Sequence, residues 1–306
     1  MALGHRPPRA VAGRHRRLTD PEPAPPADDP VPELPEAETI TREISGDLQD
    51  RRITAVRVTH DDILMNREGE AAFARDVVGR RVTRVERRAK YPLLWLDDEL
   101  VLEVQLRMTG RLMVRREPPD PSRFSHVEVE MDLDDGTATL YYDDQRRLGG
   151  FRLLTAEEWT EREGDLGPEP VDPEFGPELL STILDGRRAA VKNLLMDQRR
   201  LAGVGNIYAS ESLHRAGVDP RRPAGSLGAE ETRRLCRSLQ DVLEAAIRHF
   251  GTSFRDYVGA DGRPGDFQNH VLVYGREGEP CPGCGSPVRR IVQSGRSTFF
   301  CPDCQA

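Results

Sequence analysis

The hydrophobic pattern of this chain changes its period once, and that change divides the chain into two kinds of domain. Between residues 53 and 142 apolar and polar residues mostly alternate in short, β-branched segments, which is the pattern of half-buried strands. From residue 179 onward apolar residues recur at helical spacing. The segment LGPEPVDPEFGPE (166–178) separates the two patterns and is rich in proline and glycine. We therefore expect an α+β protein with two lobes.

The first lobe is predicted to be a β-sandwich or barrel with a leading helix. The helix begins at Pro35, with Ala37, Ile40, Ile44 and Leu48 on its apolar face. Strands are expected at ITAVRVT (53–59), RVTRVER (81–87), LVLEVQL (100–106), SHVEVEMDL (125–133) and TATLYY (137–142). Turns are expected at DDE (97–99), PPDPS (118–122) and DDG (134–136).

The second lobe is predicted to be helical over residues 179–184, 190–197, 207–216 and 229–250. The last of these helices carries a clear apolar stripe, flanked by Cys236 as an ordinary packing thiol. In the segment MDQRRLAGVGN (196–206) a helix is expected to end near Arg199, before the glycines. Those glycines and the next helix start suit a phosphate group, but a simple turn between helices explains them equally well.

Composition sets the class of protein and its partners. A chain of 306 residues suggests about two domains. The net charge of −8 is uneven: residues 187–306 hold 18 basic and 13 acidic side chains (+5), which leaves 26 and 39 (−13) for the rest. This asymmetry points weakly to a basic binding module. No apolar run approaches the ~18 residues of a membrane span, and no secretory signal is visible. The five cysteines fit a reducing cytoplasm.

Two CxxC pairs near the end of the chain predict a metal site. Cys281 and Cys284 are separated from Cys301 and Cys304 by sixteen residues. This spacing is typical of four thiolates around one tetrahedral Zn²⁺, and two matched pairs disfavour a redox motif. A four-cysteine site has no open position, so the zinc is expected to be structural. Arg296 lies between the pairs, either as a nucleic-acid contact or as an ordinary exposed arginine.

The stretch Pro32-Glu33 suggests a nucleophile if the chain begins there. A terminal amine has a pKa of ~7.7–8.0, against ~10.4 for lysine, and a following helix start lowers it further. A terminal proline would thus attack a sugar C1′ near neutral pH, and Glu33 would donate a proton to the opened ring. The argument fails if Pro32 is an internal amide, and taken alone the segment is better explained as a plain helix start.

Lysine is rare in this chain, which draws attention to the two lysines it has. Of the 44 basic residues only Lys90 and Lys192 are lysines, and the other 42 are arginines. An ammonium can release a proton in a protein, whereas a guanidinium does not. The two lysines are either retained for such chemistry or are there by chance.

Five motifs together resemble the formamidopyrimidine-DNA glycosylases, which are bifunctional base-excision repair enzymes. They are PELPEAE (32–38), RRAKY (87–91), MTGRL (108–112), GVGNIYASE (203–211) and the paired CxxC finger. The resemblance implies an N-terminal β-sandwich, a helical domain with a helix–two-turn–helix motif and a zinc finger, with double-stranded DNA bound between the lobes. It also implies removal of oxidised purines such as 8-oxoguanine and formamidopyrimidines, followed by β,δ-elimination. We expect a monomer with no membrane partner.

The resemblance also implies a role for individual residues. Pro32 matches the Schiff-base nucleophile, Glu33 the acid, Lys90 the lysine of β-elimination and Arg296 the finger arginine of δ-elimination. The positions expected at or near bound DNA are Glu36, Met108, His126, Arg146, Leu148, Arg187, Lys192 and Asn206. The predicted divisions are 1–31 (extension or mis-assigned start), 32–165 (catalytic domain), 166–178 (linker), 179–270 (helical DNA-binding domain) and 271–306 (zinc finger).

Three departures from the family pattern keep alternatives open. Leu148 replaces an aromatic wedge, and Asp266 replaces a bulky residue in the loop that caps the damaged base, so an endonuclease VIII-type enzyme for oxidised pyrimidines is the nearest rival. Thirty residues precede Val31, which stands where the family has its initiator methionine. Since GTG encodes valine but can start translation, we expect translation to begin at position 31. This leaves a chain of 276 residues (306 minus 30), which is trimmed to Pro32. Cleavage of a translated tail by a protease is the alternative. If the extension stays, the alternative is a non-catalytic damage-binding protein. A plain zinc-finger DNA-binding protein is a separate alternative, which leaves the Pro-Glu pair and Lys90 unexplained.

Overall fold

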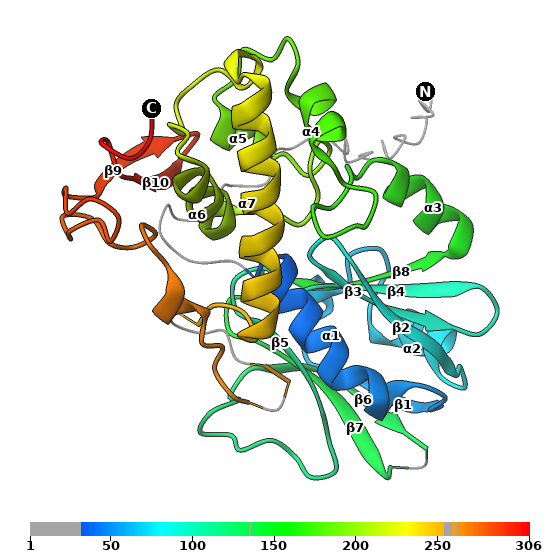
Figure 1. Cartoon of the computed structure of the whole chain (residues 1–306). Helices are drawn as coiled ribbons and strands as arrows, with labels where there is room; N and C mark the ends of the chain where they lie inside the picture. Colours follow the sequence, from blue (N-terminus) through cyan, green and yellow to red (C-terminus); the bar gives the residue numbers. More distant parts are fainter. Residues whose placement is uncertain (1–31, 135, 254–258, 261) are drawn as a thin grey trace, which may run out of the picture.

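The computed structural model describes residues 32–134, 136–253, 259–260 and 262–306 (Figure 1). It contains a β-rich lobe, a helical lobe and a small C-terminal hairpin, which confirms the predicted two-lobed α+β architecture. The predicted extension, residues 1–31, lies outside the described residues.

Helix α1 (Leu34–Leu48) connects the two lobes. Pro35 lies in its first turn, where a missing N–H costs nothing, and the carboxylate of Glu36 accepts a hydrogen bond from the Glu33 backbone N–H at 2.8 Å. Its apolar face is buried through Leu34, Ala37, Ile40, Ile44 and Leu48. The helix contacts both sheets through β2, β3 and β5, and it also contacts the long helix α7.

Two antiparallel four-stranded sheets form the β-rich lobe. One has the order β1-β6-β7-β5 and the other β2-β3-β4-β8. The strands are β1 (Ile53–Val58), β2 (Val82–Arg88), β3 (Tyr91–Leu96), β4 (Leu100–Gln105), β5 (Gly110–Arg115), β6 (Val127–Leu133), β7 (Ala138–Asp144) and β8 (Gly150–Thr155). One apolar core holds side chains of both sheets and of α1. The lobe is therefore a sandwich and not a barrel.

Strands β3, β5 and β8 and helices α2 (Glu70–Val77) and α3 (Ala156–Gly164) were not predicted from the sequence pattern. The reason is clearest for β3, YPLLWL, which is buried on both faces. Leu94 and Leu96 enter the main core, whereas Leu93 packs in a second cluster with Trp159 of α3. A strand covered on both faces has a continuous apolar run and no alternation.

The helical lobe contains α4 (Pro177–Leu184), α5 (Val191–Leu195), α6 (Asn206–Ala216) and α7 (Ala229–Arg248), and α7 runs along its length (Figure 1). The prediction that a helix ends near Arg199 is wrong, because α5 ends at Leu195. The Gln198 side chain donates to the carbonyls of Met196 and Val204 and accepts from Gly203 N–H, so the turns that follow hold each other in place. Helix α7 ends at Arg248 rather than at residue 250, because Phe250 has a φ of +58°.

The C-terminal hairpin shares the core of the helical lobe. Strands β9 (Arg289–Gln293) and β10 (Arg296–Phe300) pair between the two CxxC segments. Val288, Phe299 and Cys301 belong to the same apolar cluster as the helices. The remaining elements are the 3₁₀ helices η1 (Asp61–Ile63), η2 (Ala224–Ser226) and η3 (Phe267–His270). In the described part of the chain, no helix combines the length and apolar character that a membrane crossing requires.

A buried carboxylate, Glu169, joins the linker to the β-rich lobe. Its Oε1 lies 2.6 Å from Arg88 Nη1 and accepts from the Ala89 backbone N–H at 2.6 Å. Its Oε2 lies 2.6 Å from Arg87 Nη1. The side chain of Glu169 is only 3% exposed, whereas Glu163, which also pairs with Arg88, is 43% exposed. Two ion pairs of very different burial therefore share one arginine.

We predict that Glu169→Ala lowers the free energy of unfolding by about 3–5 kcal/mol, because it leaves two guanidinium groups facing a buried void. The matched control, Glu163→Ala, removes an exposed partner and is expected to cost about 0–1 kcal/mol. Chemical denaturation followed by circular dichroism measures both. Equal losses in the two variants would show that burial of the Glu169 pair is irrelevant to stability.

Candidate active site

The side chain of Glu33 lies at the N-terminus of helix α6. Its Oε2 accepts from the Gly205 backbone N–H at 2.7 Å, and its Oε1 accepts from the Ile207 N–H at 2.9 Å. These are free donors at a helix start, where the helix dipole also favours negative charge. Glu33 is nevertheless only 2% exposed. Burial raises its pKa, although nearby Lys90 and the N–H groups act in the opposite direction.

Lys90 occupies the tight turn between β2 and β3, and its ammonium group lies near Gly205 and Glu33. The preceding residue, Ala89, has a φ of +54°, which is uncommon for a residue with a side chain, and its N–H is fixed by Glu169. A Cβ atom added to Gly205 would lie 2.6 Å from both Glu33 Oε1 and Lys90 Nζ. Glycine is thus required where the carboxylate and the ammonium converge. Burial lowers the pKa of Lys90, whereas Glu33 raises it.

Glu36 lies beside Glu33 with its carboxylate directed into the protein. It accepts from the Glu33 N–H, from the Thr252 N–H at 2.7 Å and from the Tyr208 hydroxyl. Burial, together with the neighbouring Glu33, raises its pKa to about 7. These three bonds connect α1, α6 and the segment after α7. The predicted DNA contact of Glu36 is not visible in this arrangement, since the residue is 2% exposed.

Lys192, also predicted near DNA, is buried at 1% exposure. Its Nζ donates to Asn206 Oδ1 at 2.5 Å, to the Ser297 carbonyl at 3.0 Å and to Thr298 Oγ1 at 2.7 Å. Burial lowers the pKa of Lys192 to about 7, with nearby Glu33 acting to raise it and Arg296 to lower it. The ammonium therefore connects α5, α6 and β10, and Asn206 is its partner.

Arg296 begins strand β10 and faces the same region. Its charge lowers the pKa of both Lys90 and Lys192, as like charges do at short range. The structure thus brings Glu33, Lys90, Lys192 and Arg296 together, from four distant parts of the sequence. Pro32, immediately before Glu33, is buried at the same place.

The remaining predicted DNA-contacting residues differ in exposure. His126, Arg146 and Arg187 are exposed, and Leu148 is 44% exposed. Met108, predicted to act with Leu148 as a wedge, is 6% exposed. Leu148 lies in a turn held by Asp144, which accepts from the Arg146 and Gly149 N–H groups at 3.3 and 2.9 Å. The leucine therefore projects from a well-fixed loop.

Four residues that support the site were not identified from the sequence: Glu169, Tyr208, Glu211 and Thr252. Glu211 accepts the backbone N–H groups of Leu272, Val273 and Tyr274 and is 0% exposed. It ties α6 to the segment that leads into the finger. The signal available was a glutamate and a tyrosine within the motif GVGNIYASE, but a helical pattern does not say which polar residues are buried.

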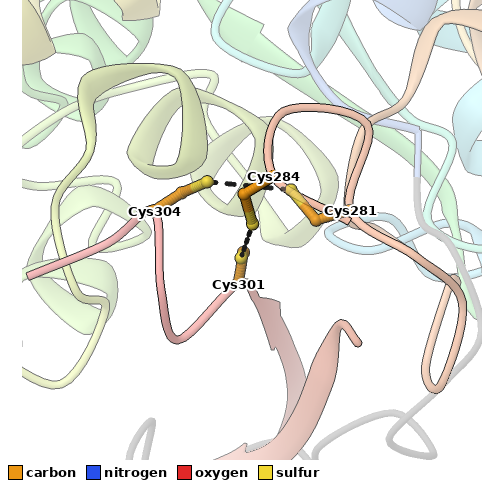
Figure 2. Close-up of side chains that lie close together, drawn as sticks. All are labelled: Cys281, Cys284, Cys301 and Cys304. Atoms are coloured by element: carbon orange, nitrogen blue, oxygen red, sulfur yellow. Dashed lines mark hydrogen bonds between the residues drawn. The ribbon is translucent and has the colours of Figure 1, made fainter. Parts of the chain in front are cut away.

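The four cysteines of the finger converge from two loops (Figure 2). The Sγ atoms of Cys281 and Cys304 are 3.9 Å apart, and those of Cys284 and Cys301 are 3.4 Å apart. Zn–S bonds of about 2.3 Å at tetrahedral angles separate the sulfur atoms by about 3.8 Å. The four thiols therefore fit one zinc ion and leave no open position on it.

Comparison with known proteins matches three parts of the chain to models of one family. Residues 31–151 match the formamidopyrimidine-DNA glycosylase N-terminal domain, residues 166–257 its H2TH domain, and residues 278–306 a zinc finger found in FPG and IleRS. The formamidopyrimidine-DNA glycosylase of Moorella thermoacetica is 46% identical over 263 residues, covering 85% of this chain and 94% of that protein. The Chloroflexus aurantiacus protein of the same name is 42% identical over 276 residues, covering 90% and 98%.

The chain belongs to the formamidopyrimidine-DNA glycosylase family. Among solved structures, the MutM (Fpg) protein of Thermus thermophilus aligns with a TM-score of 0.78 and 40% identity, covering 90% of this chain and 98% of that one. Lactococcus lactis Fpg in complex with DNA containing an abasic site aligns with a TM-score of 0.81 and 30% identity, covering 89% and 99%. Together with the cysteine geometry, the family zinc-finger match confirms one structural zinc as the cofactor of this glycosylase.

We predict that Cys284→Ser releases the zinc and abolishes DNA binding, while the β-rich lobe stays folded on its own core. Metal content by mass spectrometry and DNA affinity by fluorescence anisotropy measure the two effects. The matched control is Cys236→Ala, which removes a buried thiol from α7 and should retain one zinc. Normal binding of lesion DNA by a metal-free Cys284→Ser protein would contradict the assignment.

Proposed function

We propose that this glycosylase excises oxidised purines from double-stranded DNA through a Schiff base at Pro32 and then cleaves the strand. The class of enzyme follows from its family, a base-excision repair glycosylase with abasic-site lyase activity. Solved relatives were crystallised with DNA containing Fapy-dG or an abasic site, which supports the same substrates here. The relatives do not favour the endonuclease VIII alternative.

One observation carries the mechanism: an acid with a raised pKa lies directly beside the proposed nucleophile. The Glu33 carboxyl is enclosed between α6 and Lys90, and its burial favours the protonated form. A carboxyl group whose pKa is raised above its usual range holds its proton more strongly, which suits it to general acid catalysis. Pro32 precedes it, and α1 begins two residues later.

The proposed reaction begins at the Pro32 nitrogen. Its lone pair forms a bond to C1′ of the damaged nucleotide as the bond from C1′ to the base breaks. The departing base carries away the electron pair of that bond and takes up the proton that the amine releases. Glu33 then protonates the sugar ring oxygen, so that the ring opens and an iminium forms between Pro32 and C1′. A proline nitrogen can make this iminium only if it is a free secondary amine.

The cationic residues at the site are proposed to handle the phosphates and the eliminations. Lys90, with its pKa lowered by burial, is suited to exchange a proton during β-elimination. Arg296 is suited to hold a phosphate and to assist δ-elimination, since a guanidinium binds phosphate with two parallel hydrogen bonds. Lys192 and Asn206 keep β10, and with it Arg296, close to α6.

We further propose that Pro32 is the functional N-terminus. The match to the family N-terminal domain begins at residue 31. The relative from Heliobacterium modesticaldum is aligned over 100% of its own length but only 90% of this chain, and the family zinc-finger match extends to residue 306. A start at the Val31 codon followed by removal of methionine produces the free amine.

The DNA surface is proposed to include the exposed predicted residues on both lobes. Arg146 and Arg187 supply charge for phosphates, since Lys and Arg contacts to the backbone provide most of the affinity for DNA. Leu148 projects from its fixed turn and is suited to fill the space of a nucleotide that has left the stack. Glu36 and Met108, which are buried, are proposed to line the pocket that receives the damaged nucleotide. We propose that the enzyme acts as a monomer.

Borohydride trapping tests the proposed nucleophile. A chain that begins at Pro32, made by methionine-first expression and normal methionine removal, should form a covalent complex with 8-oxoguanine or abasic DNA. The full 306-residue chain should not, because its Pro32 nitrogen is an amide. Peptide mapping of the product should locate the cross-link at Pro32.

Two variants of the short chain sharpen the result. Pro32→Gly retains a primary amine and should trap more weakly, whereas Glu33→Gln should lose excision of the base. A cross-link at Lys90 or Lys192 would still support a lyase activity, but it would show that Pro32 is not the nucleophile. Absence of any cross-link in either chain would favour a non-catalytic damage-binding protein.

A further inference from the structure

Two histidines and an aspartate lie together where helix α7 ends and the 3₁₀ helix η3 begins. His249 follows the last residue of α7, Asp266 precedes η3, and His270 is the last residue of η3. Their side chains are 37%, 56% and 42% exposed. Their ring nitrogen and carboxylate oxygen atoms all lie within 4.8 Å of one another. No step of the excision mechanism proposed above uses these side chains, although Asp266 belongs to the loop that is expected to cap the damaged base.

Asp266 makes a long hydrogen bond to each imidazole, and the same two separations also suit a shared cation. Asp266 Oδ2 lies 3.3 Å from His249 Nδ1 and 3.3 Å from His270 Nε2. Hydrogen bonds from nitrogen to oxygen are mostly about 2.9 Å long, and shorter when charged. Ligand atoms at about 2.0–2.2 Å from a tetrahedral metal ion are about 3.3–3.5 Å apart.

The backbone holds the three residues in this arrangement. The Asp266 N–H donates to the His249 carbonyl at 2.8 Å, and the Phe267 N–H donates to the Gly251 carbonyl at 3.0 Å. The Asn269 side chain donates to Asp266 Oδ1 at 2.7 Å, so the other carboxylate oxygen faces the imidazole rings. Both rings pack near the buried Phe267, with centroids 6.4 and 6.1 Å from it.

We propose that His249, Asp266 and His270 bind one divalent metal ion of the zinc class, at a site separate from the four cysteines. Imidazole and carboxylate ligands suit Zn²⁺, Ni²⁺ and Cu²⁺. Three protein ligands leave a further position on the ion for water. This ligand set differs from the four thiolates of the finger, so the two ions are distinguishable by spectroscopy.

An ion at this site joins the end of α7 to η3. Phe267 of η3 packs against Tyr208 with ring centroids 5.7 Å apart, and the Tyr208 hydroxyl donates to Glu36. Thr252, three residues after His249, also donates to Glu36. The ion thereby restrains backbone that reaches the carboxylates beside Pro32. A ligand that binds only the folded state also raises the temperature of unfolding.

Metal titration of the intact zinc-loaded protein tests this proposal. Isothermal calorimetry with ZnCl₂ should reveal a second equivalent beyond the finger zinc. Asp266→Asn and His270→Gln should each lower its affinity at least tenfold, while mass spectrometry finds the finger zinc retained. Co²⁺ added to the second site should give a spectrum of nitrogen and oxygen ligands without thiolate charge-transfer bands.

The matched control is His60→Gln. His60 also pairs with a carboxylate, Glu128, at 2.6 Å and is 50% exposed, but it belongs to no group of three metal-binding side chains among the described residues. This variant should keep the second equivalent and its thermal stabilisation by Zn²⁺, and circular dichroism checks that all variants fold. The proposal is overturned if the unmodified protein binds only one equivalent of Zn²⁺, or if Asp266→Asn and His270→Gln bind the second equivalent as tightly as the unmodified protein does. In either case the three side chains form ion pairs and do not bind a metal ion.

Discussion

The hydrogen bonds from the start of helix α6 to the Glu33 carboxylate are the interaction on which the rest of the structure depends. Glu33 belongs to the chain that enters the β-rich lobe, whereas Gly205 and Ile207 belong to the helical lobe. A hydrogen bond contributes about 0.5–1.5 kcal/mol net, and a buried polar group left without its partners costs about 1–3 kcal/mol. The two lobes are thus held in one relative position by a group that also belongs to the active site. The same contact explains why position 205 has no room for a side chain.

Burial at this junction changes the acid–base properties of four groups at once. It raises the pKa values of Glu33 and Glu36, and it lowers those of Lys90 and Lys192. The pKa values of Glu36 and Lys192 both move to about 7, so the pKa of a carboxylic acid and the pKa of an amine become similar at this junction. Proton transfer is most effective between groups whose pKa values lie near the working pH. A buried junction between the two lobes is therefore also a suitable place for a reaction that transfers several protons.

The sequence predicted those features that depend on local pattern. The four cysteines could be assigned from their spacing alone, and the stripe of α7 predicted its first residue correctly and its last within two. Strand β3 was missed because both of its faces are covered, which removes the alternation. The end of α5 was misplaced because Gln198 fixes the following turns through its side chain. A pattern of apolar residues contains neither kind of information.

The candidate site was predicted in part for a similar reason. The motifs identified Glu33, Lys90 and Arg296, which the fold brings together from three distant segments. They did not reveal that Lys192 is enclosed and bonded to Ser297 and Thr298, because the direction of a long side chain depends on tertiary packing. Glu169 and Glu211 were missed because each accepts backbone N–H groups from segments far away in sequence. Such partners become visible only once the chain has folded.

The measurement that tests this account most directly is the titration of the Glu33 side chain in the chain that begins at Pro32. Carbon-13 NMR of labelled glutamate follows the carboxyl shift with pH, and the spectrum of Glu33→Gln assigns the signal. Since Glu33 and Glu36 are close, their curves should be analysed as a coupled pair. We expect the Glu33 carboxyl to titrate above the usual value of 4.5, because its burial outweighs the N–H groups and Lys90. A midpoint at or below 4.5 would show that the carboxylate is ionised when DNA binds and would contradict its role as the acid.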